Sequence, residues 1–220
     1  MQVAVVDLDV PAERMAQLRA SLSPREQQRY DSFAHDELRH RWGAARGWLR
    51  LLLSRALGCA PAEVAFAYGE HGKPHVAGSP LRFNISHSGG RALIALALCE
   101  VGVDIELPRA RRTDAIAKRF FAPGENARLF ALPDAARADA FFRLWTCKEA
   151  FLKVTGEGLS RSTRSFEIDV GPPARLLWAG GIADAADRFS VHPIEAGEPY
   201  RAALVAESPR VFLRFLNPEA

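Results

Sequence analysis

The alternation of apolar and polar positions divides the first hundred residues into strands around one long helical region. Ser23-Pro24-Arg25-Glu26 is typical of a helix start, with Ser23 as N-cap and Glu26 three residues later. The helical pattern continues in two pieces to Leu57, and Gly58 ends it. Period-two alternation predicts strands at Val3–Asp7, Val64–Tyr68, Leu81–Ser86, Arg91–Cys99 and Val101–Leu107.

The second half of the chain repeats this arrangement of helices followed by strands. Helical patterns cover Thr113–Phe121 and Glu125–Leu132, and Asp134–Ala138 is expected to be a polar connection. The most apolar helix follows at Phe141–Thr155. Short strands are predicted at Phe166–Val170, Leu176–Ala179, Phe189–Pro193, Ala202–Ala206 and Val211–Phe215.

The helix Phe141–Thr155 carries charged residues among its apolar ones. Trp145, Lys148, Glu149 and Leu152 follow the i, i+3, i+4, i+7 spacing of one helical face, which places charges on the side expected to point inward. Lys153 follows Glu149 by one turn. The pattern fits a functional pair, and it also fits a solvated Glu–Lys pair at the edge of an ordinary buried helix.

Shifting the chain along itself reveals an internal repeat. Trp42-x-x-x-Arg46-x-Trp48-Leu49-Arg50 aligns with Trp145-x-x-x-Glu149-x-Phe151-Leu152-Lys153, and strands follow each copy at similar distances. This favours an α/β (α+β) fold with a pseudo-two-fold duplication, each half a helix on a mostly antiparallel sheet. The expected division is 1–100 and 101–220. In this alignment Arg46 corresponds to Glu149 and Arg50 to Lys153, so only the second copy would be active.

Composition narrows the class of protein. With 220 residues, 48% of them hydrophobic, the chain can bury a large core. Its three cysteines form neither a zinc nor a disulfide pattern, and its start lacks the basic segment of a signal peptide. The longest apolar run, Ala92–Cys99, is too short to span a membrane. We expect a cytoplasmic protein with no membrane or nucleic-acid partner, whose net charge of +3 favours an acidic partner.

Two polar clusters are candidates for chemistry. Asp104 and Glu106 alternate with apolar residues on one strand, so both face one side, where a cation such as Mg2+ would relieve their repulsion. The alternative is a solvated strand end. Phe83-Asn84-Ile85-Ser86-His87-Ser88-Gly89-Gly90 offers hydroxyls and an imidazole suited to phosphate, or a plain turn. A hydrolase that uses the Ser–His pair lacks support because no Gly-x-Ser-x-Gly elbow is present, and Lys73 does not follow P-loop spacing.

Taken together these motifs resemble the 4'-phosphopantetheinyl transferases, and in particular their larger, monomeric branch that activates peptide and polyketide synthetases. The matching motifs occur in the family's order: Gly72-Lys73-Pro74, Phe83-Asn84-Ile85-Ser86-His87-Ser88, Gly102-Val103-Asp104-Ile105-Glu106 and Trp145-x-x-Lys148-Glu149-Ala150-x-x-Lys153. The resemblance implies transfer of the phosphopantetheine arm of coenzyme A to a serine of an apo acyl- or peptidyl-carrier protein, with release of 3',5'-adenosine bisphosphate.

The resemblance also assigns roles by position. Asp104, Glu106 and Glu149 match the ligands of Mg2+, for which Mn2+ would substitute. Glu149 matches the general base, acting directly or through water, and Lys153 the cation beside the pyrophosphate. Coenzyme A contacts are implied for the remaining matched positions, which are Arg41, Lys73, Ser86, His87 and Ser88. Two other functions stay open: a carrier-protein-binding module without activity, and a Mg2+-dependent phosphohydrolase of coenzyme A.

Overall fold

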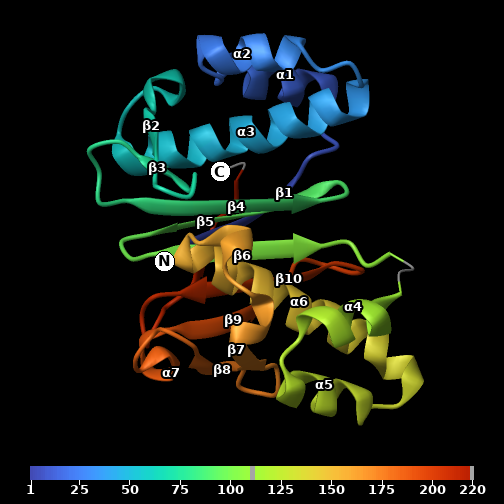
Figure 1. The fold of residues 1–220 in the computed structure, drawn as a ribbon. Helices are drawn as coiled ribbons and strands as arrows, with labels where there is room; N and C mark the ends of the chain where they lie inside the picture. The colour runs from blue at the N-terminus through green and yellow to red at the C-terminus, as the bar shows by residue number, and fades with distance from the viewer. Residues whose placement is uncertain (110–111, 219–220) are drawn as a thin grey trace.

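The computed structural model describes residues 1–109 and 112–218, in which two similar runs of elements follow one another (Figure 1). The first run is β1 (Gln2–Asp7), α1 (Ala12–Ala20), α2 (Pro24–Asp31), α3 (Asp36–Leu57), η1 (Pro61–Glu63), β2 (Phe66–Tyr68), β3 (Pro74–Val76), β4 (Arg82–Ser88) and β5 (Arg91–Ala97). The second is β6 (Val101–Glu106), α4 (Thr113–Phe120), α5 (Pro123–Phe130), α6 (Asp134–Thr155), η2 (Gly158–Ser160), η3 (Thr163–Ser165), β7 (Phe166–Asp169), β8 (Arg175–Ala179), α7 (Ala185–Arg188), β9 (Ser190–Ile194), β10 (Arg201–Ala206) and β11 (Arg214–Phe215).

The strand order repeats in the two main sheets. The first sheet runs β11-β1-β5-β4 and the second β6-β10-β9, so β6, β10 and β9 occupy the places of β1, β5 and β4. Pairing is antiparallel except between β1 and β11, and each run adds a small hairpin, β2–β3 or β7–β8. The predicted α/β fold with duplicated, mostly antiparallel halves is confirmed.

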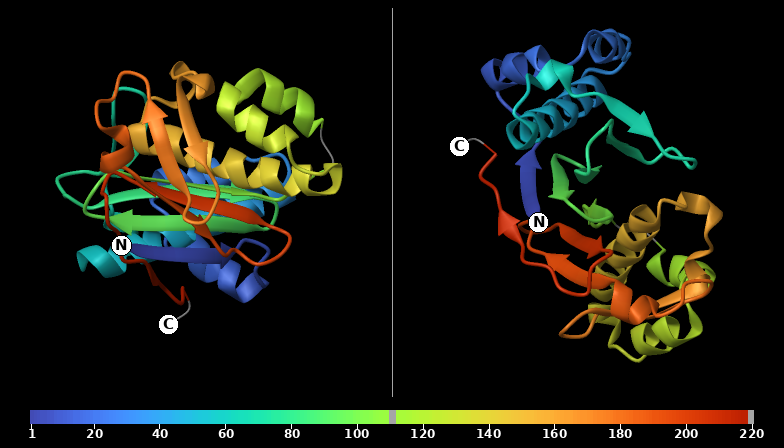
Figure 2. Two further views of the ribbon diagram at one scale, coloured as in Figure 1. Left: turned by 90° about the horizontal axis from the view of Figure 1, so that it is seen from below. Right: turned by 90° about the vertical axis from the view of Figure 1, so that its left-hand side faces the viewer.

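Three cores hold the layers together. Strand side chains such as Val3, Leu93, Val103 and Leu204 form the core between the two sheets. The outer face of the first sheet packs against α1 and α3, and α6 with α4 and α5 packs against the second sheet (Figure 2). The two long helices therefore lie on opposite sides of the stacked sheets. None of the described helices is both long and apolar enough to cross a membrane.

The helix ends correct the register of the repeat. Both α3 and α6 have 22 residues and end at a left-handed glycine, Gly58 with φ 69° and Gly156 with φ 74°. Aligning these ends places Lys148 opposite Arg50, Glu149 opposite Leu51 and Lys153 opposite Arg55. The expected pairing of Glu149 with Arg46 is therefore wrong by five residues, about 1.4 helical turns; a short run of similar residues on two apolar helices could not fix the register.

Local signals located some elements well and missed others. The capping box at Ser23 is present, since Ser23 Oγ accepts from the Glu26 backbone N–H and the Glu26 carboxylate accepts from the Ser23 N–H. Helix α6 begins at Asp134, so the expected polar connection at Asp134–Ala138 is wrong. Helix α1 was not predicted, and only Arg214–Phe215 of the last predicted strand pairs.

Candidate active site at the junction of β4, β6 and α6

From Phe141 onward helix α6 is buried on most sides, and this decides which of its residues face the site. Most side chains from Phe141 to Val154 are buried, whereas Arg143 is exposed and Trp145, Glu149 and Lys153 are only partly covered. These three are spaced at i, i+4 and i+8, so they form one open row along the helix. The expected inward stripe is therefore right for Lys148 and Leu152, which are buried, and wrong for Trp145 and Glu149, which lie on the partly open row.

Gly102 brings α6 against β6. A Cβ atom at Gly102 would lie 2.1 Å from the Ala150 carbonyl oxygen and 2.4 Å from the Val154 backbone nitrogen. Any larger residue would therefore push the helix away. Because alternate residues of a strand share a face, Gly102, Asp104 and Glu106 all point to the side of β6 that α6 covers. The glycine thus admits the helix that carries Glu149 and Lys153.

Asp104 is at the centre of the polar contacts. Lys153 Nζ lies 2.6 Å from Asp104 Oδ1, and the Ser86 hydroxyl donates to the same oxygen over 2.8 Å. Lys153 Nζ also donates to Ser86 Oγ over 2.9 Å. The carboxylate is only 5% exposed, and its second oxygen, Oδ2, has no hydrogen-bond partner among the described residues. A buried carboxylate oxygen without a donor is costly and suits an incoming cation or donor.

The same face of β4 meets β6 at three successive alternate positions. Two residues before Ser86, Asn84 Oδ1 accepts from the Val103 N–H over 2.9 Å. Two residues after it, the Ser88 hydroxyl donates to Glu106 Oε2 over 2.9 Å. Side-chain bonds thus join the edge strands of the two sheets. Asn84 was part of the predicted cluster but was assigned no role, and the even spacing of the three residues is the signal that relates them.

The charges of Asp104, Glu106 and Lys153 act on the pKa of Glu149. Burial raises the pKa of Glu149, the negative charge of Asp104 raises it further, Lys153 opposes the shift, and Glu106 adds to it. The proton affinity of Glu149 therefore depends on both strand carboxylates and on the lysine one turn along. The structure brings together Ser86, Ser88, Asp104, Glu106, Glu149 and Lys153.

The donors of this group are of the kind that Mg2+ selects, namely carboxylate and hydroxyl oxygens. As they stand, no three acidic, histidine or cysteine side chains within residues 1–109 and 112–218 are gathered closely enough to enclose a metal ion. The free Oδ2 of Asp104 and the mutual repulsion felt by Glu149 are nevertheless what a cation would relieve. In their chemistry these residues fit a divalent cation.

The other predicted contacts lie further out. His87 is an exposed residue on the opposite face of β4 from Ser86 and Ser88; partial desolvation of its imidazole, and then the positive charge of Lys153, lower the pKa of His87. Lys73 Nζ binds the Glu100 carboxylate at 2.6 Å and the Val154 carbonyl oxygen at 3.0 Å, and burial lowers its pKa. Lys73 reaches the end of α6, but it has no hydrogen bond to Asp104, Glu106 or Glu149 among the described contacts.

Arg41 is held at the other end of the strands. Its guanidinium donates to both carboxylate oxygens of Asp9, over 2.7 and 2.9 Å, and pairs with Glu37. The hydrogen bond to Asp9 is the main cause that raises the pKa of Arg41. Asp9 in turn lies against Gly90, in the turn that follows Ser88. Arg41 and Lys73 therefore mark opposite ends of the β4–β6 junction.

A hollow of about 870 Å3 between α2, α3 and β2 was not predicted. Arginines and aromatic rings line it, among them Arg25, Arg29, Trp42, Phe66 and Tyr68. The guanidinium of Arg29 lies over the Trp42 ring, 5.2 Å from its centre. The unusual number of arginines between Arg25 and Arg55 was the visible signal of this basic surface.

Known proteins resemble the chain in sequence. A model of the 4'-phosphopantetheinyl transferase superfamily matches residues 100–205, which include Asp104, Glu106, Glu149 and Lys153. The 4'-phosphopantetheinyl transferase HetI of Nostoc sp. is 41% identical over 182 residues, covering 79% of this chain and 76% of that protein. A 4'-phosphopantetheinyl transferase of Bacillus subtilis is 32% identical over 212 residues, covering 95% and 93%. Sfp of Bacillus subtilis strain 168 is 29% identical over 205 residues, covering 93% and 90%.

Proposed function

The chain belongs to the 4'-phosphopantetheinyl transferase superfamily, and on that premise we propose that the group around Asp104 is where it transfers phosphopantetheine from coenzyme A to a carrier-protein serine. The serine oxygen forms a new bond to the phosphorus that bears the pantetheine arm. The pyrophosphate P–O bond breaks, and 3',5'-adenosine bisphosphate leaves. The observation that carries the proposal is the contact of Lys153 with buried Asp104, whose Oδ2 is left without a donor.

Glu149 would accept the serine proton, directly or through one water. Its raised pKa makes it a better base than an ordinary glutamate, and Lys153, one turn along, helps to keep it ionised. Lys153 in turn offers its ammonium group to the pyrophosphate and to the charge that develops on the leaving phosphate. Its contacts with Asp104 Oδ1 and Ser86 Oγ keep the ammonium group at the β4–β6 junction, where the pyrophosphate would bind.

Asp104, Glu106 and Glu149 would hold Mg2+, with Mn2+ as a substitute. When bound, the cation neutralises pyrophosphate charge and makes the phosphorus more susceptible to attack. The protein's part is to hold the three carboxylates in place. Ser86 and Ser88 do this for the two strand residues, since each donates a hydroxyl hydrogen bond to one of them, at 2.8 and 2.9 Å.

Coenzyme A would lie along the end of β4, where Ser86 and Ser88 on one face and His87 on the other can meet phosphate oxygens. Lys73 and Arg41 would contact the nucleotide end by exchanging their present carboxylate partners, Glu100 and Asp9, for phosphate. We propose a division of work in which residues 1–100 chiefly bind coenzyme A and residues 101–220 supply the metal ligands and the base. The protein would act as a monomer in the cytoplasm.

Weighing the carrier protein tests the function. The chain is incubated with coenzyme A, Mg2+ and an apo carrier protein, and the carrier and the coenzyme A are then analysed by mass spectrometry. A gain equal to the phosphopantetheine arm is expected. An unchanged carrier with intact coenzyme A would indicate a binding module, and an unchanged carrier with cleaved coenzyme A would indicate a hydrolase. Glu149→Gln and Lys153→Met test the site, because both should lose most of the transfer.

A further inference from the structure

Next to Glu149, Lys148 makes an ion pair inside the protein. Its side chain is 1% exposed, and that of its partner Glu125 is completely covered. Lys148 Nζ lies 2.7 Å from Glu125 Oε1, donates to the Phe166 carbonyl oxygen over 3.1 Å and lies 4.0 Å from the centre of the Phe166 ring. Glu125 also accepts from the backbone N–H groups of Ala122, over 2.7 Å, and Ile168, over 2.8 Å. One buried pair therefore connects α6, the start of α5 and β7.

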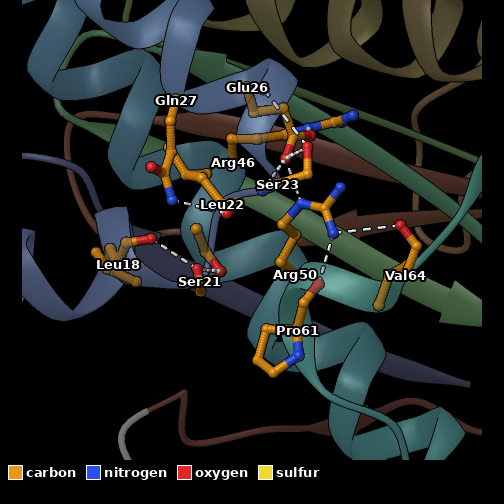
Figure 3. Close-up of polar contacts among 11 residues, drawn as sticks. Leu18, Ser21, Leu22, Ser23, Glu26, Gln27, Arg46, Arg50, Pro61 and Val64 are labelled. Atoms are coloured by element: carbon orange, nitrogen blue, oxygen red, sulfur yellow. Dashed lines mark hydrogen bonds and ion pairs between the residues drawn. The ribbon is translucent and has the colours of Figure 1, made fainter.

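The first half contains the same arrangement, built from Glu26 and Arg50 (Figure 3). Glu26 is the third residue of α2, as Glu125 is the third residue of α5, and both helices begin with proline. Arg50 and Lys148 each lie eight residues before the glycine that ends their helix. Arg50 likewise donates to carbonyl oxygens ahead of the hairpin, those of Pro61 and Val64, and its guanidinium lies 5.0 Å from the centre of the Phe66 ring. We call these two arrangements the α6 brace and the α3 brace.

The two braces differ in the residues that come after them along the helix. Arg50 is succeeded by Leu51 and, four residues later, by Arg55, which donates to the Pro218 carbonyl oxygen. Lys148 is succeeded by Glu149 and Lys153 at the corresponding positions. The α3 brace thus supports a half without the catalytic pair, and the α6 brace supports the half that has it. The chain therefore contains its own control for a purely structural role.

Keeping a lysine and a glutamate so deeply buried is unfavourable. Burial raises the pKa of Glu125 and lowers the pKa of Lys148, each toward the neutral form. A buried ion pair often adds little or no stability relative to apolar residues of similar volume. A gain in stability therefore explains the α6 brace poorly. Its directional hydrogen bonds, which fix how α6, α5 and β7 are oriented, explain it better.

We propose that Lys148 and Glu125 are positioning residues, which fix the rotation of α6 so that Glu149 and Lys153 face Asp104. Lys148 and Glu149 are successive helical residues, about 100° apart around the axis. Tying Lys148 to α5 and β7 therefore sets the direction of Glu149. A rotation of about 20° would move a side-chain end, about 5–6 Å from the axis, by about 2 Å. This would break the 2.6 Å contact between Lys153 and Asp104.

The test compares two neutralised braces in the full-length enzyme. Glu125→Gln/Lys148→Met removes the charges of the α6 brace, and Glu26→Gln/Arg50→Met does the same for the α3 brace. Both pairs change one carboxylate to its amide and one cation to an unbranched apolar chain. In the α3 variant Arg46, which also pairs with Glu26, loses that carboxylate and keeps its contact with the Phe66 ring. The measurements are the thermal midpoint, kcat and KM for transfer to an apo carrier protein, and Mn2+ affinity by electron paramagnetic resonance without carrier.

Similar thermal midpoints are expected for the two variants, but only the α6 variant should lose kcat and Mn2+ affinity, by roughly 10- to 100-fold as for other residues that orient ligands. Equal losses of kcat in both variants would overturn the proposal, because both braces would then be structural only. If the α6 variant does not fold, Lys148→Arg decides: it keeps the pair in the chemistry of the α3 brace and should retain kcat. A folded Lys148→Arg variant without activity would also overturn it.

The proposal rests on the roles proposed for Glu149 and Lys153, so Glu149→Gln is measured alongside. If Glu149→Gln transfers at the parent rate, the proposed catalytic site is wrong. If Glu149→Gln is inactive while the two neutralised braces behave alike, the site stands and the positioning role of Lys148 is wrong.

Discussion

Replacing Gly102 by alanine tests whether the close approach of α6 to β6 assembles the catalytic group. The new Cβ would lie 2.1 Å from the Ala150 oxygen, 2.4 Å from the Val154 nitrogen and 2.9 Å from the Lys153 carbonyl carbon. All three are backbone atoms of one helix, so no side chain can rotate away, and α6 must move by about 1 Å to restore van der Waals contact. Overpacking of this kind typically costs about 1–3 kcal/mol.

For a protein of this size each kcal/mol lowers the thermal midpoint by about 2–4 °C, so a decrease of about 2–12 °C is expected. The same movement carries Lys153 away from Asp104, and a misplacement of about 1 Å can cost about 100-fold in rate. Calorimetry and the carrier mass assay measure the two effects. Gly69→Ala is the stability control, because its Cβ would meet only the Lys73 oxygen, at an ordinary 3.7 Å. A Gly102→Ala protein that melts and transfers like the parent would refute this account.

Three other outcomes are expected. Asp104→Asn should abolish most transfer while the protein stays folded, as judged by circular dichroism. Full transfer by this variant, or full transfer by the parent protein in excess chelator, would contradict the metal assignment. His87→Ala should weaken coenzyme A binding by about 1–3 kcal/mol, measured by titration calorimetry, where unchanged affinity would remove His87 from the site. Burial pushes the pKa of Glu26 upward, but hydrogen bonds from Arg50 and Arg46 outweigh it and lower the pKa. The stability that Glu26 adds should therefore be full above the ordinary glutamate pKa and decline as pH falls through its lowered value, so Glu26→Gln should flatten the acid limb of unfolding free energy against pH.

Local sequence patterns were sufficient for the chemistry of the candidate group. Asp104 and Glu106 share a face because alternate residues of any strand do, and the same rule aligns Ser86 with Ser88. The capping box at Ser23 and the glycines that end α3 and α6 are likewise set by neighbouring residues. These features need only short-range geometry, so the order of motifs was enough to indicate the family.

The direction of α6 was decided by tertiary packing. A helix covered on most sides has no single apolar stripe, so periodicity could not show that Glu149 lies with Trp145 and Lys153 on the open row. Spacing indicated that Lys148 points inward, but it could not show that the partner there is Glu125, 23 residues earlier in the chain. The partners of a buried charge are chosen by which elements meet around it, and that depends on how the sheets and helices stack. The sequence determined which reactive groups the chain has, while the packing of α6 on Gly102 determined which of them meet.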